Sequence, residues 1–424
     1  MKRLNTVSAL LAVAMLFLAS CGGGPTGYGT AQQSPDMLSQ EQAGPTLPGG
    51  MQTPAPAPVN LRPVKVGILL PLSGEHQQLG QSMLKAAQMA LFDVGYEGFE
   101  LIPRDTKNTP QDAATAARAA LADGAELLLG PIFSEHVAAI KPIAQQANVN
   151  VIAFSTDWKQ AGGNAYIMGF LPFDQIERVV RFAAKQNMRR VGVIAPSSDY
   201  GQIAVSAVQA SVGRAGLQMA DITRFNPQTK ELTATIRQFS HFDERHPPGM
   251  PMNPNLPFDA VFMPVGGDSA KIISNMLGQF DMTPAKVKRL GTGLFDDPSL
   301  SQEPALEGAW FAAPSPNARQ AFERRFMQSY GYSAPRLTTL AYDATALAAI
   351  LAKRGLSAPE NKPGFDRASL INPNGFAGID GIFRFRTDGT AERGLAVLEI
   401  RRGSMSIIED APKSFMQTVV TPAP

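Results

Sequence analysis

The sequence predicts an α/β fold with two lobes, each built on a parallel sheet that helices cover on both faces. Short apolar runs alternate with amphipathic helical segments along most of the chain, which is typical of parallel sheets. About ten such strands are too many for one ordinary doubly wound sheet. The 424 residues also suffice for two or three domains of about 150 residues each.

The composition excludes several classes of protein. Hydrophobic residues make up 44% of the chain and charged residues 17%, a balance that supports sizeable cores and excludes wholesale disorder. The net charge of +2 gives no electrostatic reason to expect a nucleic-acid partner. A single cysteine excludes an intramolecular disulfide and a Cys-based zinc site. We therefore expect neither a metal nor a cofactor.

The first residues are typical of a lipoprotein leader. An almost wholly apolar run at 9–19 follows a basic start and spans about 16 Å as a helix, too short for a hydrocarbon core of about 30 Å. The run ends in Leu-Ala-Ser-Cys at 18–21, which resembles the bacterial lipobox. That resemblance implies cleavage after residue 20 and lipidation of Cys21. The alternative is an ordinary secretory signal with a chance cysteine.

The next segment, residues 21–63, is expected to be a lipid-anchored, disordered tether. It is rich in Gly, Pro, Gln and Thr and offers few residues to bury. Such a segment reaches on the order of 35 Å as a flexible coil and about 130 Å as a polyproline helix. It is either a spacer that clears the membrane surface or a device that reaches a distant partner.

The folded part is expected to begin with a strand at 64–70, an apolar run that Pro71 and Gly74 end. Apolar residues at helical spacing then predict a helix over 79–94. Thr109, Pro110 and Asp112 form a helix start, because threonine caps and proline fits the first turn. The further predicted strands are 100–103, 126–129, 149–154, 191–195, 217–222, 259–263 and 289–291. The further predicted helices are 113–122, 134–147, 173–186, 200–215, 229–239, 269–280, 317–330 and 338–353.

The last part of the chain predicts a hairpin. Residues 381–386 and 395–400 are strand-like, and the link between them contains Asp388-Gly389, a strong turn signal. Residues 411–424 are expected to be a tail.

Small hydroxyl residues follow two of the predicted strands, where parallel sheets bind ligands. Ser134 comes after 126–129 at the start of a helix, whose free N–H groups favour an anion. Ser155 and Thr156 come directly after 149–154. The three hydroxyls either hold a ligand carboxylate or only cap helices.

Two further candidates follow strands of the second lobe. Tyr200 follows 191–195 and either faces the same cleft or packs in the core. Asp296 and Asp297 follow the turn after 289–291 and either meet an ammonium group or form a solvated acidic pair.

Enzyme signatures are absent from the sequence, so no catalytic residue is assigned. Neither a P-loop nor a Gly-x-Ser-x-Gly elbow occurs. Ser134-Glu135-His136 lie on one helix start and cannot face one another as a catalytic triad must. His241 and His246 have loose spacing in a proline-rich segment, which favours a solvated loop over a metal site.

Several motifs in order resemble the type I periplasmic binding proteins, and the leucine/isoleucine/valine-binding class is the closest well-known group. The similarity covers about 64–408. The matching motifs are Val66-Gly67-Ile68-Leu69-Leu70-Pro71-Leu72-Ser73-Gly74, Leu79-Gly80, Leu129-Gly130-Pro131, Ser155-Thr156, Asp199-Tyr200-Gly201, Ala341-Tyr342-Asp343-Ala344 and Gly378-Ile379-Asp380-Gly381.

The resemblance implies two Rossmann-like lobes joined by three hinge crossings, near 169–172, 312–316 and 375–381. Lobe 1 then comprises 64–171 and 315–376, and lobe 2 comprises 172–314 and 377–410. The family binds a ligand in the cleft between the lobes and closes on it.

The family also implies a small-molecule ligand, which in its amino-acid-binding members is held by first-lobe hydroxyls and a second-lobe aromatic residue. The positions that match, or that we add as candidates, are Ser134, Ser155, Thr156, Tyr200, Leu79 and Asp296. The acidic residue for the ammonium group is displaced here, because Thr292-Gly293-Leu294-Phe295 stands before Asp296. The expected function is a non-enzymatic amino-acid receptor of an ABC-type import system, with an ABC permease as partner.

The penicillin-binding-protein activator lipoproteins are a branch of the same fold, and they match this chain where it departs from the amino-acid-binding pattern. Phe262-Met263-Pro264 and Gly291-Thr292-Gly293-Leu294-Phe295-Asp296-Asp297 resemble that branch, as do the lipid anchor and the tether. The alternative function is therefore regulation of a peptidoglycan synthase. Gly22 after the cysteine lacks the acidic signal for inner-membrane retention, so either function is expected on the periplasmic side of a bacterial membrane, the outer one if there are two.

Overall fold

The computed structural model describes residues 63–226 and 231–415. The leader, Cys21 and all of the tether except its last residue lie outside the described residues, as does the tail beyond 415. The described residues belong to one compact unit, Asn60–Pro424. In the ranges that the structure describes, no helix has both the length and the apolar character needed to cross a bilayer.

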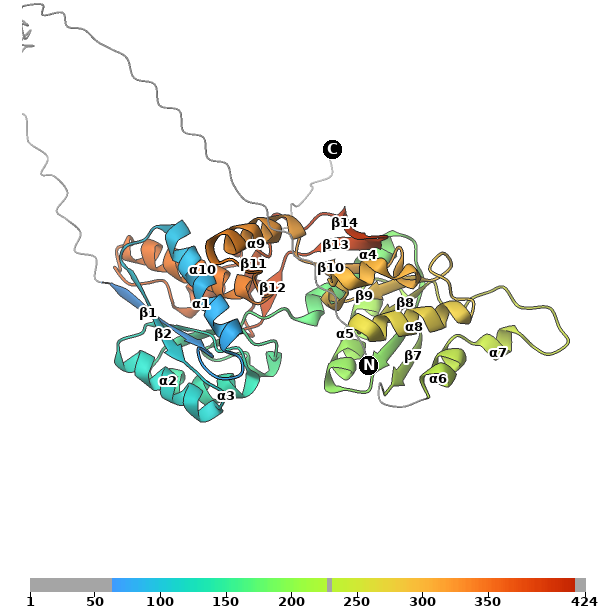
Figure 1. The fold of residues 1–424 in the computed structure, drawn as a ribbon, viewed down its shortest axis with the longest axis horizontal. Coiled ribbons are helices and arrows are strands. Elements are labelled where there is room, and N and C mark those ends of the chain that lie inside the picture. Colours follow the sequence, from blue (N-terminus) through green and yellow to red (C-terminus); the bar gives the residue numbers. More distant parts are fainter. Residues whose placement is uncertain (1–62, 227–230, 416–424) are drawn as a thin grey trace, which may run out of the picture. The chain divides into compact units, whose positions relative to one another are not determined.

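The first lobe is built on a five-stranded parallel sheet in the order β2-β1-β3-β4-β5 (Figure 1). Its strands are β1 (Val64–Leu70), β2 (Phe99–Asp105), β3 (Leu127–Leu129), β4 (Asn150–Ala153) and β5 (Ala165–Ile167). Alternate residues of β1 face two separate cores. Val66 and Ile68 pack with one helix layer and Leu69 with the other, because successive strand residues point to opposite faces.

Helices α1 (Gln77–Val94) and α10 (Thr338–Leu356) cover one face of this sheet, and α2 (Pro110–Ala122) and α3 (Ser134–Gln146) cover the other. Helix α9 (Pro316–Tyr330) packs on the outside of α1. Helices α1 and α10 contribute Met83 and Leu347 to one core, and α2 and α3 contribute Ala117 and Val137 to the other. Helix α2 begins as expected, with the Thr109 side chain accepting a hydrogen bond from the Asp112 N–H.

The second lobe has a seven-stranded sheet in the order β14-β13-β10-β9-β8-β6-β7. Its strands are β6 (Arg190–Pro196), β7 (Gln218–Phe225), β8 (Ala260–Met263), β9 (Lys288–Gly291), β10 (Trp310–Ala313), β13 (Ala396–Arg401) and β14 (Ser404–Glu409). Strand β13 pairs antiparallel with both β10 and β14, so this sheet is mixed. Sequence patterning missed β5, β10 and β14, and also a strand at 391–393.

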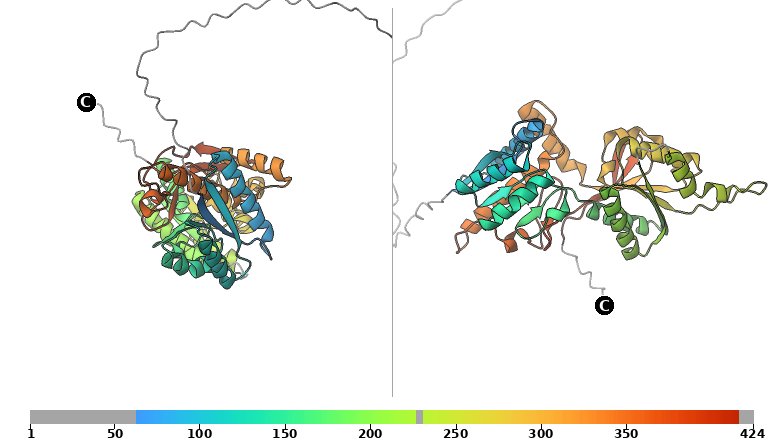
Figure 2. Two further views of the ribbon diagram at one scale, coloured as in Figure 1. Left: turned by 90° about the vertical axis from the view of Figure 1, so that its left-hand side faces the viewer. Right: turned by 90° about the horizontal axis from the view of Figure 1, so that it is seen from below.

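The helices of the second lobe also form two layers (Figure 2). They are α4 (Pro172–Lys185), α5 (Asp199–Arg214), α6 (Leu232–Phe239), α7 (Phe242–Arg245) and α8 (Gly267–Gln279). Val179 of α4 and Val208 of α5 pack in one core, and Phe239 of α6 and Ile273 of α8 pack in the other. Short elements complete the described part: α11 (Arg367–Leu370), η1 (Trp158–Gln160), η2 (Gly293–Phe295), η3 (Pro298–Gln302) and η4 (Pro304–Leu306).

The chain passes between the lobes three times, and the third crossing differs from its expected position. The first two crossings lie between β5 and α4 and between β10 and α9. Strands β11 (Phe383–Phe385) and β12 (Ala391–Arg393) pair with each other and pack in the first lobe's core. The third crossing therefore lies at 394–395 and not at 375–381, because the buried rings of Phe383 and Phe385 hold 377–393 on the first lobe.

The first strand of the predicted hairpin pairs with a different segment than expected. The Asp388-Gly389 turn forms, but 383–385 pairs with 391–393. The expected partner segment becomes β13, which pairs with β10 and β14 instead.

Candidate functional site

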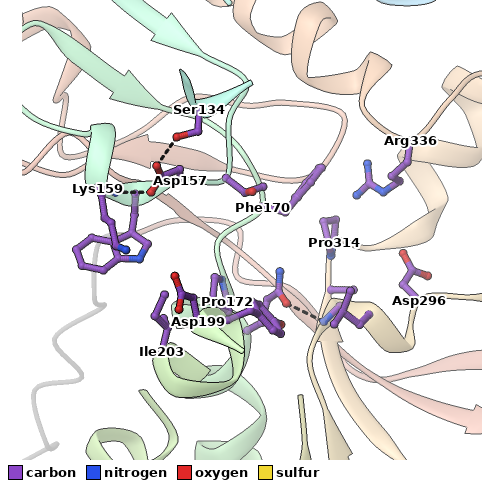
Figure 3. Close-up of a pocket in the computed structure, with 17 residues that line it drawn as sticks. Ser134, Asp157, Lys159, Phe170, Pro172, Asp199, Ile203, Asp296, Pro314 and Arg336 are labelled. Carbon is purple, nitrogen blue, oxygen red and sulfur yellow. Dashed lines mark hydrogen bonds between the residues drawn. The ribbon is translucent and has the colours of Figure 1, made fainter. Parts of the chain in front are cut away.

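A cavity of about 630 Å³ is lined by residues from both lobes (Figure 3). Most of its lining comes from segments that follow strands, where the free ends of parallel strands place loops and helix starts. The lining residues are Ser134, Thr156, Asp157, Trp158, Lys159, Phe170, Pro172, Gln175, Asp199, Tyr200, Ile203, Gly293, Leu294, Asp296, Ala313, Pro314 and Arg336.

Four of the predicted ligand residues line this cavity and two do not. Ser134, Thr156, Tyr200 and Asp296 are part of the lining. The Ser155 side chain is buried, and its hydroxyl accepts a hydrogen bond from the Asp157 N–H at 3.0 Å. Leu79 packs against the first lobe's core and is not part of the lining.

Ser134 is the first residue of α3, and its hydroxyl donates to the carboxylate of Asp157. The turn from β3 to α3 passes through Gly130 at φ 84°, where a Cβ would lie 2.3 Å from the Leu69 carbonyl oxygen. Only glycine fits this close approach. The sequence placed a ligand carboxylate beside Ser134, and the structure has the chain's own carboxylate there.

Two further donors hold Asp157. The Lys159 N–H donates to Oδ1 at 3.1 Å, and the Gln160 amide donates to Oδ2 at 3.2 Å. Burial on its own would raise the pKa of Asp157, but these bonds and the one from Ser134 outweigh it and lower the pKa below its usual value. Hydrogen bonds from the chain therefore stabilise the ionised Asp157 carboxylate in place of water.

On the second lobe, two hydrogen bonds fix the loop that ends β9. The Tyr200 hydroxyl lies 3.2 Å from Thr292 Oγ1, and burial raises the pKa of Tyr200. The Gln175 side-chain oxygen accepts a hydrogen bond from the Gly293 N–H at 2.7 Å. Tyr200 thus meets the cavity as a neutral phenol with one polar partner.

Asp296 is neither solvated nor free. Its carboxylate forms an ion pair with Arg319 of α9, with Nη1 to Oδ2 at 2.5 Å and Nη2 to Oδ1 at 3.4 Å. Desolvation lowers the pKa of Arg319, but the bond and charge of Asp296 outweigh it and raise the pKa above its usual value. Asp297, the other acid of the predicted pair, caps η3 by accepting a hydrogen bond from the Ser299 N–H at 2.8 Å.

Sequence reasoning missed several lining residues, above all Asp157 and Arg336. Asp157 directly follows Thr156, so its position after β4 was a usable signal. Arg336 lies between α9 and α10 with no motif around it. Its guanidinium pairs with the buried carboxylate of Asp380 at 2.9 Å and lies 4.1 Å from the centroid of the Phe170 ring.

The histidines take part in local contacts. His241 Nδ1 lies 2.8 Å from Glu244, and His246 Nε2 lies 3.3 Å from Asp281. Over the residues that the structure describes, no group of three or more acidic, histidine or cysteine side chains is placed to hold a metal ion.

Two α/β lobes joined by three crossings, with a cavity lined from both, define a two-lobed ligand-binding protein. The sequence matches the profile of the family described as periplasmic binding protein over residues 63–404, and the chain belongs to this family. The family consists of binding proteins, not enzymes.

Solved structures with this fold come from several bacteria. A protein from Rhodospirillum rubrum named for a branched-chain amino acid ABC transporter is 18% identical with a TM-score of 0.70, covering 82% of this chain and 100% of its own. The leucine binding protein LivK from Thermotoga maritima is 22% identical with a TM-score of 0.54, covering 81% of this chain and 97% of its own.

A solute binding protein of an ABC transporter from Rhodopseudomonas palustris, in complex with 3,4-dihydroxybenzoic acid, is 17% identical. Its TM-score is 0.56, and the match covers 82% of this chain and 96% of its own. At these identities the likeness establishes the type I periplasmic binding protein fold. A comparison with curated proteins returned no match.

Proposed function

We propose that this chain is a non-enzymatic, lipid-anchored receptor on the periplasmic side of a bacterial membrane, which binds a small molecule for an ABC-type import system. The cavity lined from both lobes carries this proposal. Family membership supports a binding role. Proteins of the same fold are named for ABC transporters, for leucine binding and for a complex with 3,4-dihydroxybenzoic acid.

The lining favours a ligand with an apolar body. Trp158, Phe170, Tyr200, Ile203 and Leu294 supply apolar surface from both lobes, and small-molecule sites are mostly apolar with few polar groups. A branched-chain amino acid, the ligand expected from the sequence, is one candidate. An aromatic compound is another, because three of these five side chains are aromatic rings.

The test is a binding screen with a matched pair of variants. Thermal shift and calorimetry with the common amino acids and hydroxybenzoates should find a ligand that raises the melting temperature, since binding to the native state stabilises it. Trp158→Ala should lower the affinity for that ligand about tenfold, because it removes surface on which the ligand stacks. Phe92→Ala removes an even more exposed ring outside the cavity and should leave binding unchanged. No shift with any compound would count against the receptor function.

The alternative function, regulation of a peptidoglycan synthase by a lipoprotein of the activator type, has a specific observation in its favour. Two of the three acidic groups in the lining, Asp157 and Asp296, are engaged within the chain. The tether length and the position of Cys21 also suit a regulator that reaches from an outer membrane. The matching test measures a purified peptidoglycan synthase with and without the chain. A rise in its rate, together with an empty ligand screen, would favour the regulator over the receptor.

A further inference from the structure

The cavity has charged groups on two opposite sides, and the chain satisfies both of them itself. Ser134 and Asp157 lie on one side, and Asp296 lies on the other with Arg336 (Figure 3). Each group has an internal partner: a hydroxyl for Asp157, Arg319 for Asp296 and Asp380 for Arg336. This pattern restricts the ligands that the cavity accepts.

On the first side, the donors that hold Asp157 are not free for a ligand carboxylate, and the other donors of the lining there, the Thr156 hydroxyl and the Lys159 ammonium, are exposed to water. The Ser134 hydroxyl, the Lys159 N–H and the Gln160 amide all donate to Asp157. A second carboxylate at this place would lie beside the first, and two like charges at short range strongly disfavour both being ionised. The helix start at Ser134 already stabilises one anion, which is part of the chain.

On the second side, a ligand ammonium meets a cation already in place. Asp296 and Arg319 are only 14% and 16% exposed, and two nitrogens of the guanidinium face the two carboxylate oxygens. Separating Arg319 from Asp296 would leave its charge to Glu323, at 3.6 Å from Nε, and to the more indirect effect of Asp380. Breaking a largely buried pair by removing one partner is costly, so an ammonium group does not compete well for Asp296.

The remaining charges of the lining do not replace these groups. Arg336 gives both terminal nitrogens to Asp380 and one also to Thr339. Lys159 and Asp199 are exposed at the edge of the cavity, where water weakens an ion pair to about 1 kcal/mol or less. Binding energy therefore comes from the apolar surface.

We infer that Asp157 and Arg319 are specificity-determining residues that occupy the two charged subsites with the chain's own groups, so that the cavity takes a ligand with an apolar or aromatic body and no charge at either end. This inference rests on the proposed receptor function. It excludes free α-amino acids as the preferred ligands and favours neutral compounds of the same size.

Four probes that share a phenylpropanoyl body and differ in their charged groups test it on the folded chain. They are L-phenylalanine, L-phenylalaninamide, 3-phenylpropanoate and 3-phenylpropanamide, which carry both charges, the ammonium only, the carboxylate only and neither. Calorimetry on the wild-type protein should find the neutral amide bound at least about tenfold more tightly than L-phenylalanine. This is the affinity expected to be lost when a charged group of the ligand gives up its hydrogen bonds to water and finds no charged partner in the cavity.

Variants then open each subsite. Asp157→Ala frees the Ser134 hydroxyl and should gain affinity for 3-phenylpropanoate, and Arg319→Ala frees Asp296 and should gain affinity for L-phenylalaninamide. The double variant should gain affinity for L-phenylalanine, about tenfold or more. Arg319→Lys keeps the charge and should gain nothing, and circular dichroism confirms that each variant is folded.

The outcomes separate the inference from the function beneath it. Wild-type protein that binds L-phenylalanine as tightly as the amide would overturn the inference, and so would a folded double variant that binds L-phenylalanine no better than wild type. If the wild-type protein binds none of the probes but the double variant binds L-phenylalanine, Asp157 and Arg319 do occupy the two charged subsites, but the preference for neutral ligands and the receptor function both fail for ligands of this size.

Discussion

Two regions that share Arg336 differ in how deeply their charged side chains are buried. In the cavity, Asp157, Asp296 and Arg336 are partly exposed and each has its own partner. Beside it lies a buried cluster of Asp343, Asp380 and Arg393, which are 2%, 0% and 7% exposed. The cavity groups decide what binds, and the cluster holds the segments that cross between the lobes.

The contacts of Arg393 define that structural role. Its Nη2 donates to the Met168 carbonyl at 2.9 Å, just before the first crossing. Its backbone N–H donates to Asp174 of α4 at 3.1 Å. Strand β12, which precedes the third crossing, is thus tied to both ends of the first crossing. Charges buried this deeply are tolerated only with counter-charges and hydrogen bonds.

Removing the cation of the cluster should have the largest effect. Arg393→Met keeps the apolar stem but leaves Asp343 and Asp380 with much less positive charge. The expected loss is about 3–5 kcal/mol of unfolding free energy, because the variant removes a buried positive charge that acts on both carboxylates and leaves mainly Arg336 to balance them. Urea unfolding measures it.

The control for this variant is Arg401→Met, which breaks an exposed ion pair with Glu399 and should cost less than about 1 kcal/mol. Equal losses in the two variants would remove the distinction between the cluster and the surface.

The pH dependence of stability sharpens the comparison. Burial, and then the charge of Asp380, raise the pKa of Asp343 to about 7, whereas an unfolded aspartate titrates near pH ~4. Between pH ~4 and about 7 the native state holds a proton on Asp343 that the unfolded state has released. The stabilisation that this proton gives the native state is complete below pH ~4 and is lost as pH rises to about 7.

Asp343→Asn removes that titration while keeping a neutral group of similar shape. As pH rises from ~4 to ~7, the unfolding free energy of the variant should increase relative to that of the wild type by up to about 1.4 kcal/mol per pH unit. Denaturation at several pH values measures the difference. A constant difference across this range would show that Asp343 does not titrate there.

The sequence predicted the regular elements better than the charges. Helix α2 could be predicted because Thr109, Pro110 and Asp112 are local signals of a helix start. The third crossing could not, since Asp388-Gly389 specifies a turn but not which strand pairs after it. Patterning likewise missed β10, a four-residue strand in the middle of the sheet.

The candidate site shows the same limit. The hydroxyls Ser134 and Thr156 could be placed at the cavity because they follow parallel strands. Their partners could not, because the contacts of Ser134 with Asp157 and of Asp296 with Arg319 join residues 23 positions apart. Only packing brings such residues together.

A smaller effect is expected at Tyr200, whose single polar contact is with Thr292. Tyr200→Phe should cost about 1 kcal/mol of stability, the net value of one hydrogen bond. It should leave the affinity for a neutral aromatic probe within about threefold, since the ring stays in place. Thermal unfolding and calorimetry on the same sample measure both quantities. A large loss of affinity would mean that the hydroxyl itself contacts the ligand.

The cavity's charged subsites are filled by the chain's own side chains. A crystal structure of the protein grown with 3-phenylpropanamide tests this most directly. We expect the phenyl ring to lie against Trp158 and Phe170, with the bonds of Ser134 to Asp157 and of Asp296 to Arg319 intact. A ligand group bonded to Ser134 or Asp296, with Asp157 or Arg319 turned away, would contradict it.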